Sequence, residues 1–135
     1  MSTELGFRVE LAQPYEQAIE TVTAALKGEG FGVLTRIDVR ATMKEKLGKE
    51  FRPYAILGAC NPPIAYRALM HDPRFGLLLP CNVTVEENPK GGATVNIIDP
   101  RVMVAWAGEP DEEMQEIAEE GSRRLQNVVL ALKKA

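Results

Sequence analysis

The chain has 135 residues, 45% of them hydrophobic and 26% charged, and its formal net charge is -3. This composition is typical of one soluble globular domain over residues 1–135, large enough to form a core without disulfide or metal support. The acidic balance argues against nucleic acid as a partner, and no segment approaches the roughly 20 apolar residues that cross a membrane.

The N-terminal residues do not form the apolar segment of a secretory signal, so we expect a cytoplasmic protein. In that compartment its two cysteines are expected to stay reduced. Two cysteines and one histidine cannot form an all-Cys/His structural zinc site within one chain. The sequence leaves any cofactor, metal site and catalytic residue unassigned.

The first forty residues alternate between the spacing of a strand and that of a helix. Apolar residues alternate with polar ones over 7–11, which predicts a half-buried strand. Pro14 opens a helix with one apolar stripe, and Gly28 and Gly30 end it. A second strand is predicted over 31–37.

Short elements with clear capping residues follow. Asp38 caps a short helix that ends at Gly48. Residues 54–59 are apolar on both faces, which predicts a central strand. Asn61 caps a third helix, with a proline at its first position, and this helix ends before Pro73.

The C-terminal part begins with a predicted hairpin of strands 79–87 and 93–98, joined by a turn rich in glycine. Residues 101–107 fit a short helix or an irregular segment as well as a strand. Pro110 opens the last helix, whose acidic first turn suits the positive helix end. The helix has one buried stripe, formed by Met114, Ile117, Ala118, Gly121, Leu125, Val128, Val129 and Leu132.

The order of these elements predicts an α+β fold. We expect a mostly antiparallel five-stranded sheet in β-α-β-β-β-β-α order with short helical insertions. Two long helices are expected to pack on one face of the sheet.

Both cysteines occur in a Cys-Asn dipeptide, and these four residues form the candidate ligand site. Cys60 lies where a strand gives way to a helix, and is either a reactive thiol or a small buried side chain. Asn61 is a site residue or simply the helix cap, and Cys81 a site residue or a core thiol. If the predicted strands 54–59 and 79–87 are antiparallel neighbours, the two thiols lie close together. Alternation sends Cys81 and Asn82 to opposite faces, so all four side chains are not expected to converge.

Other polar residues are weaker candidates. His71 ends a helix, where it complements the helix dipole or acts as a general base without an identifiable partner. Asp99 precedes a proline and is interpreted as a turn former. Lys44, Arg52 and Tyr54 either line an anion pocket or are solvated.

Four segments together resemble the bacterial and archaeal family known as domain of unknown function 302. They are 32–38 (GVLTRID), 42–48 (TMKEKLG), 52–63 (RPYAILGACNPP) and 76–83 (GLLLPCNV). The resemblance implies a curved antiparallel sheet with two helices, as in the TATA-box-binding-protein-like fold, and a homodimer. It brings no catalytic residues.

Three functions are compatible with the sequence. The first is binding of a small molecule or a soft metal ion by a site lined by Cys60, Asn61, Cys81 and Asn82. The second is a protein-interaction or dimeric assembly module that uses residues 101–107 and a sheet edge. The third is a thiol-dependent enzyme with Cys60 as the nucleophile.

Overall fold

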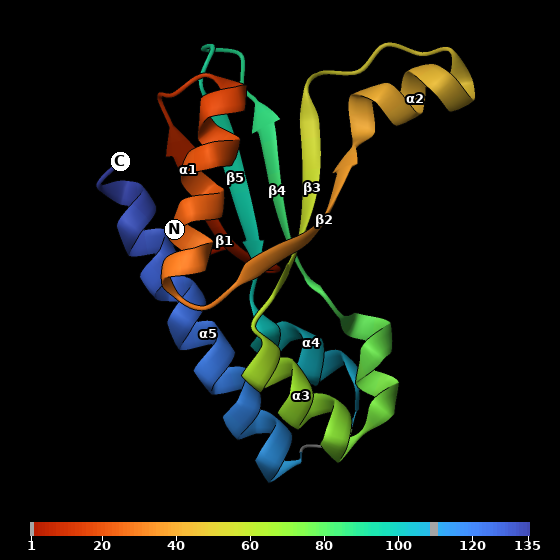
Figure 1. Ribbon diagram of the computed structural model, residues 1–135, viewed down its shortest axis with the longest axis vertical. Helices are drawn as coiled ribbons and strands as arrows, with labels where there is room; N and C mark the ends of the chain where they lie inside the picture. Colours follow the sequence, from red (N-terminus) through yellow and green to blue (C-terminus); the bar gives the residue numbers. More distant parts are fainter. Residues whose placement is uncertain (1, 109–110) are drawn as a thin grey trace.

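The computed structural model describes residues 2–108 and 111–135, which form one sheet with flanking helices (Figure 1). The strands are β1 (Gly6–Leu11), β2 (Gly32–Asp38), β3 (Tyr54–Cys60), β4 (Cys81–Glu87) and β5 (Ala93–Ile98). The helices are α1 (Tyr15–Gly28), α2 (Val39–Leu47), α3 (Pro62–His71), α4 (Pro100–Trp106) and α5 (Glu112–Lys133), with a 3-10 helix, η1, at Pro73–Leu78. The predicted α+β class is confirmed.

The five strands are arranged in the order β1-β5-β4-β3-β2, and each neighbouring pair is antiparallel. β3 is an interior strand as predicted, although β4 and not β3 occupies the middle of the sheet. In the β3–β4 pair, Leu57 lies opposite Val83 and Ala59 lies opposite Cys81. The end of β3 therefore adjoins the start of β4, as the antiparallel arrangement requires.

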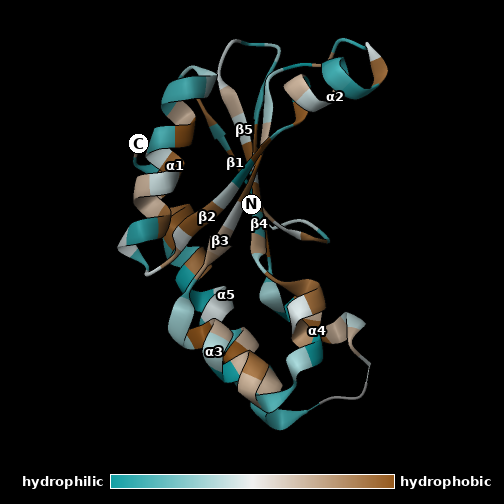
Figure 2. Ribbon diagram, turned by 45° about the vertical axis from the view of Figure 1, so that its right-hand side comes forward, coloured by the Kyte–Doolittle hydropathy of each residue, from teal (hydrophilic) through white to brown (hydrophobic). Residues whose placement is uncertain are grey.

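The long helices α1 and α5 lie side by side against one face of the sheet (Figures 1 and 2). Each helix buries one stripe of apolar residues, which is why its sequence repeats at helical spacing. Every residue of the stripe predicted for α5 is buried, and Ser122 is buried with them. Leu26, Leu57, Val85 and Leu125 are among the fully buried residues of this core.

α5 is longer than the sheet it covers. Its 22 residues span roughly 33 Å, whereas a seven-residue strand spans roughly 23 Å. The N-terminal part of α5 consequently projects past the end of the sheet, where α3, η1 and α4 gather around it (Figure 1). A second apolar cluster forms there, built on Ala68, Met114 and Ile117.

Several boundaries differ from the sequence-based expectation for identifiable reasons. β4 begins at Cys81 and not at residue 79, because Pro80 has no backbone N–H to offer a neighbouring strand. Residues 101–107, left open by the sequence, belong mostly to α4, which Asp99 caps by accepting the Arg101 N–H at 3.0 Å. Asp111 caps α5, while the predicted opening residue Pro110 lies outside the described residues.

β2 and α2 form an arm that leaves the body of the molecule (Figure 1). Asp38 caps α2 and Gly48 ends it in the left-handed conformation, as predicted. None of the nine residues of α2, all of them described, is buried. Leu34, Ile37 and Leu47 are 68%, 48% and 62% exposed, so the arm presents apolar side chains to solvent.

Across the described residues, every helix is too short or too polar to cross a membrane.

Candidate functional site

An apolar pocket lies where the sheet ends and α3, η1, α4 and the first turns of α5 begin. Its volume is about 60 Å³, which exceeds the roughly 10–15 Å³ that one water molecule needs. The described residues that line it include no Asp, Glu, Lys, Arg or His. The pocket is therefore suited to an uncharged or soft ligand and unsuited to a hydrated ion.

Both cysteines line this pocket. Cys60 is the last residue of β3 and Cys81 the first of β4, so the antiparallel pairing brings the two together at one end of the sheet. Both are free thiols. Burial, together with a smaller effect of the nearby Cys60, raises the pKa of Cys81 to about 11. Cys81 is consequently a neutral thiol at physiological pH.

The two asparagines are not equivalent. Asn61 is buried at the pocket wall, where its side-chain oxygen accepts the Ile64 N–H at 3.2 Å and its amide donates to the Glu29 carbonyl at 3.3 Å. Asn61 therefore fixes the start of α3 next to Cys60, with both ends of its amide engaged. Asn82 is exposed and lies opposite Gly58, outside the set of pocket residues. Three of the four predicted site residues, Cys60, Asn61 and Cys81, therefore line the same pocket, and Asn82 does not.

Two methionines and the 3-10 helix complete the pocket, although no residue pattern in the sequence predicts them there. Met103 of α4 and Met114 of α5 are both buried and line the pocket with Phe75 and Leu78 of η1. Their placement depends on the packing of four separate elements, which residue spacing within one element does not reveal. No cluster of three potential metal-binding His, Cys, Asp or Glu side chains occurs among residues 2–108 and 111–135.

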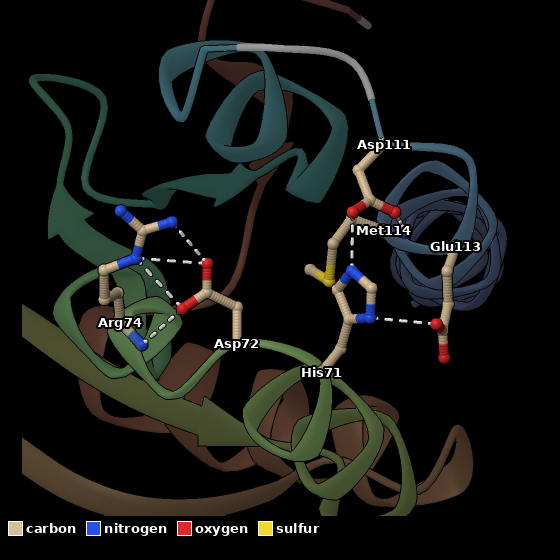
Figure 3. Close-up of polar contacts among 6 residues, drawn as sticks. All are labelled: His71, Asp72, Arg74, Asp111, Glu113 and Met114. Atoms are coloured by element: carbon tan, nitrogen blue, oxygen red, sulfur yellow. Dashed lines mark hydrogen bonds and ion pairs between the residues drawn. The ribbon is translucent and has the colours of Figure 1, made fainter.

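His71 holds the end of α3 against the start of α5 (Figure 3). Its Nε2 lies 2.6 Å from Asp111 Oδ2, and its Nδ1 lies 2.8 Å from Glu113 Oε2. The hydrogen bond with Asp111 raises the pKa of His71; partial burial opposes this shift and the charges of Asp111 and Glu113 add to it. The partners that the sequence could not identify are therefore two carboxylates forty and more residues away.

Asp99 supports the pocket wall from the other side. It is buried, caps α4 and forms an ion pair with Arg101 at 2.8 Å. Burial raises the pKa of Asp99, but hydrogen bonds from Arg101 and Ser122 outweigh it and leave the pKa below its ordinary value. Asp99 is therefore more than the predicted turn former, because α4 contributes Met103 and Val104 to the pocket.

The remaining candidates are engaged elsewhere. Lys44 lies 2.7 Å from Glu50, and Arg52 lies 2.7 Å from Glu86. The Tyr54 ring packs against Phe51 at a centroid distance of 5.9 Å. These contacts satisfy the two cations with carboxylates of the chain itself.

Comparisons with known proteins agree with this architecture. The family model described as "Domain of unknown function DUF302" matches residues 7–132. The crystal structure of an uncharacterized conserved protein DUF302 from Bacillus stearothermophilus is similar, with a TM-score of 0.85 and 30% sequence identity. That match covers 96% of this chain and 99% of the other. None of the curated proteins matches the chain.

Proposed function

The chain belongs to the DUF302 family, and we propose that it binds a small apolar molecule or a soft metal ion in the pocket lined by Cys60 and Cys81. The observation that supports this proposal is that both free thiols line one apolar pocket whose described lining residues are uncharged. Thiolate sulfur is a preferred ligand of soft ions such as Cu(I), and apolar walls accept an uncharged molecule. We also propose that the protein works in the cytoplasm, where unbridged thiols are the rule.

The enzyme alternative has less support. A general base would have to lie near the Cys60 thiol, and the described pocket residues include neither His nor Asp nor Glu. The neutral Cys81 thiol does not take that role either, because its pKa is raised to about 11. We therefore place binding ahead of catalysis.

Replacing both Cys60 and Cys81 with alanine is expected to weaken Cu(I) binding by at least about tenfold, because both sulfur ligands are removed. In the unmodified protein Cu(I) affinity should increase with pH, since the metal competes with the proton of a thiol whose pKa is raised. Competition with a coloured Cu(I) chelator under anaerobic conditions measures both effects.

Asn82→Ala is the matched control, because Asn82 follows Cys81 directly yet lies outside the pocket. Its Cu(I) affinity should equal that of the unmodified protein. Xenon-induced NMR shifts test the apolar ligand separately. If neither Cu(I) nor xenon bound, or if the double alanine variant bound both unchanged, the proposal would be wrong.

We propose, as a second function, assembly into a homodimer through β2 and α2. β2 ends the sheet, and a strand at a sheet edge is a template for pairing with a second chain. The exposed Leu34, Ile37 and Leu47 on the same arm supply apolar surface for such a contact. The other contact surface suggested by the sequence, residues 101–107, lies mostly in α4. Its Trp106 is also exposed.

Ile37→Lys is expected to raise the dimer dissociation constant by about tenfold, since it places a charge on the proposed contact. Leu130→Lys is its control: Leu130 is 54% exposed, similar to Ile37, but belongs to α5 on the helical face. Sedimentation over a range of protein concentrations measures both. A monomer at every concentration, or equal effects of the two substitutions, would exclude this interface.

A further inference from the structure

The pocket has a second, wider hollow on its outer side. This hollow, with a volume of about 580 Å³, is lined by residues that include His71, Asp72, Arg74 and Asp111. It shares four side chains with the pocket: Phe75, Leu78, Val104 and Met114. These four side chains, which we call the partition, separate the pocket from the outer hollow.

The partition limits what passes from the outer hollow into the pocket. At about 60 Å³ the pocket is smaller than the cavity of roughly 150 Å³ that holds benzene. A larger ligand requires the partition to move. Two partition residues belong to η1, which follows α3 directly, and Met114 belongs to the first turn of α5. The position of the end of α3 relative to α5 therefore controls the partition.

His71 sets that position, and only its protonated form does so fully. Each ring nitrogen lies within hydrogen-bond distance of a carboxylate, Asp111 on one side and Glu113 on the other (Figure 3). A neutral imidazole has one N–H and cannot donate to both, whereas the imidazolium ion has two. Asp111 also accepts the backbone N–H of Met114 at 3.2 Å, which connects the clamp directly to a partition residue.

The charges around His71 are mostly acidic. Asp111 and Glu113 face it from α5, and Asp72 follows it in the chain. Arg74 of η1 is the nearby cation, but it is paired with Asp72 at 2.7 Å, and this pair holds the pKa of Asp72 at about 2. The surroundings therefore favour the imidazolium ion, in agreement with the raised pKa of His71.

A second tether between α3 and α5 behaves differently. Arg67 Nη1 lies 2.9 Å from Glu120 Oε1, in the middle of the helix contact. This tether contains no histidine. This ion pair joins α3 to α5 one turn before the His71 end of α3.

We propose that His71 is a pH-dependent latch on the pocket: the imidazolium ion joins α3 to α5 and closes the partition, and its deprotonation releases one carboxylate and lets the partition open. This inference rests on the proposed function for the identity of what enters, but not for the opening itself. The sign follows from the raised pKa: the clamp is complete below the ordinary histidine pKa and is lost as pH rises through the raised value.

The test measures access to the two cysteines with methyl methanethiosulfonate, a small uncharged thiol reagent that needs no bound ligand. Labelling rates are compared between His71→Gln and the unmodified protein from pH 5.5 to 8.5. Taking the ratio at each pH cancels the rise in thiolate that speeds both reactions. We expect the variant to react about threefold to tenfold faster at the acidic end, with the ratio falling to one at the alkaline end.

Two further variants separate the latch from a general loosening. Glu113→Gln, which keeps the imidazole and the Asp111 cap, should reproduce the fast labelling at acidic pH in part. Arg67→Gln removes the other tether, so any increase in its rate should be independent of pH. NMR titration of the only histidine gives the pKa against which the midpoint of the ratio is compared.

A ratio of one at all pH values, or a constant ratio while His71 titrates, would overturn the latch. That result is distinct from failure of the proposed function, which is decided by Cu(I) and xenon binding. If the pocket binds xenon but access to its cysteines does not depend on pH, the latch is excluded and the proposed ligand binding is retained.

Discussion

Ala118→Leu is expected to weaken xenon binding in the pocket by about a hundredfold, equivalent to ~2.7 kcal/mol. Ala118 is buried on α5 and lines the pocket. The larger isobutyl group of leucine is therefore expected to extend into the empty space of the pocket. The pocket volume of about 60 Å³ is small enough for this group to occupy much of it. Xenon-induced chemical-shift changes of the neighbouring methyl groups measure the loss.

The matched control is Ala131→Leu, which makes the same change on an exposed position of the same helix. It should bind xenon like the unmodified protein. Thermal unfolding of both variants checks that Ala118→Leu remains folded, since overpacking costs about 1–3 kcal/mol. Where the Ala118 variant is too unstable, Ala65→Leu fills the pocket from α3 instead. If a folded variant with a filled pocket still bound xenon saturably, the xenon site would not be this pocket.

The sheet could be predicted because each of its elements has a local signal. The hairpin of β4 and β5 has alternating residues around a glycine-rich turn, and α5 repeats its buried residues at helical spacing. Asp38 and Asn61 were identified as caps by residue type alone, and each side chain makes the expected hydrogen bond.

α4 also has a local capping signal in its sequence. Asp99-Pro100 has the pattern of a helix cap followed by proline at the first helical position, as Asn61-Pro62 has. The apolar segment after it hid the helix, because seven residues are too few to distinguish a helical period from a strand. Applying the cap rule consistently would have predicted α4 and with it one wall of the pocket.

In the candidate site, too, some contacts could be predicted from local sequence signals and others could not. The proximity of Cys60 and Cys81 followed from one inference, that β3 and β4 are antiparallel neighbours. The clamp on His71 required knowing that the end of α3 meets the start of α5, forty residues later in the chain. No periodicity encodes such a contact, because it depends on how far α5 projects beyond the sheet.

That projection also explains why the site lies where it does. Over the sheet, α1 and α5 pack against continuous strands and leave a close-packed core. Past the end of the sheet, α5 is covered by short helices whose ends are fixed by polar contacts, Asn61 for α3 and Asp99 for α4. The apolar pocket is the space between these short elements and the end of the sheet.

Leu57→Ala should lower the free energy of unfolding by about 3 kcal/mol, whereas Ile56→Ala, on the opposite face of β3, should cost about 1 kcal/mol. Leu57 is 1% exposed beneath the helices, while Ile56 is half-buried on the other face. Urea unfolding at low protein concentration measures both. Equal losses would mean that a second layer covers the Ile56 face. If the Ile56→Ala loss grew only with protein concentration, that layer would be another copy of the chain, and the dimer would use this face instead of the β2 edge.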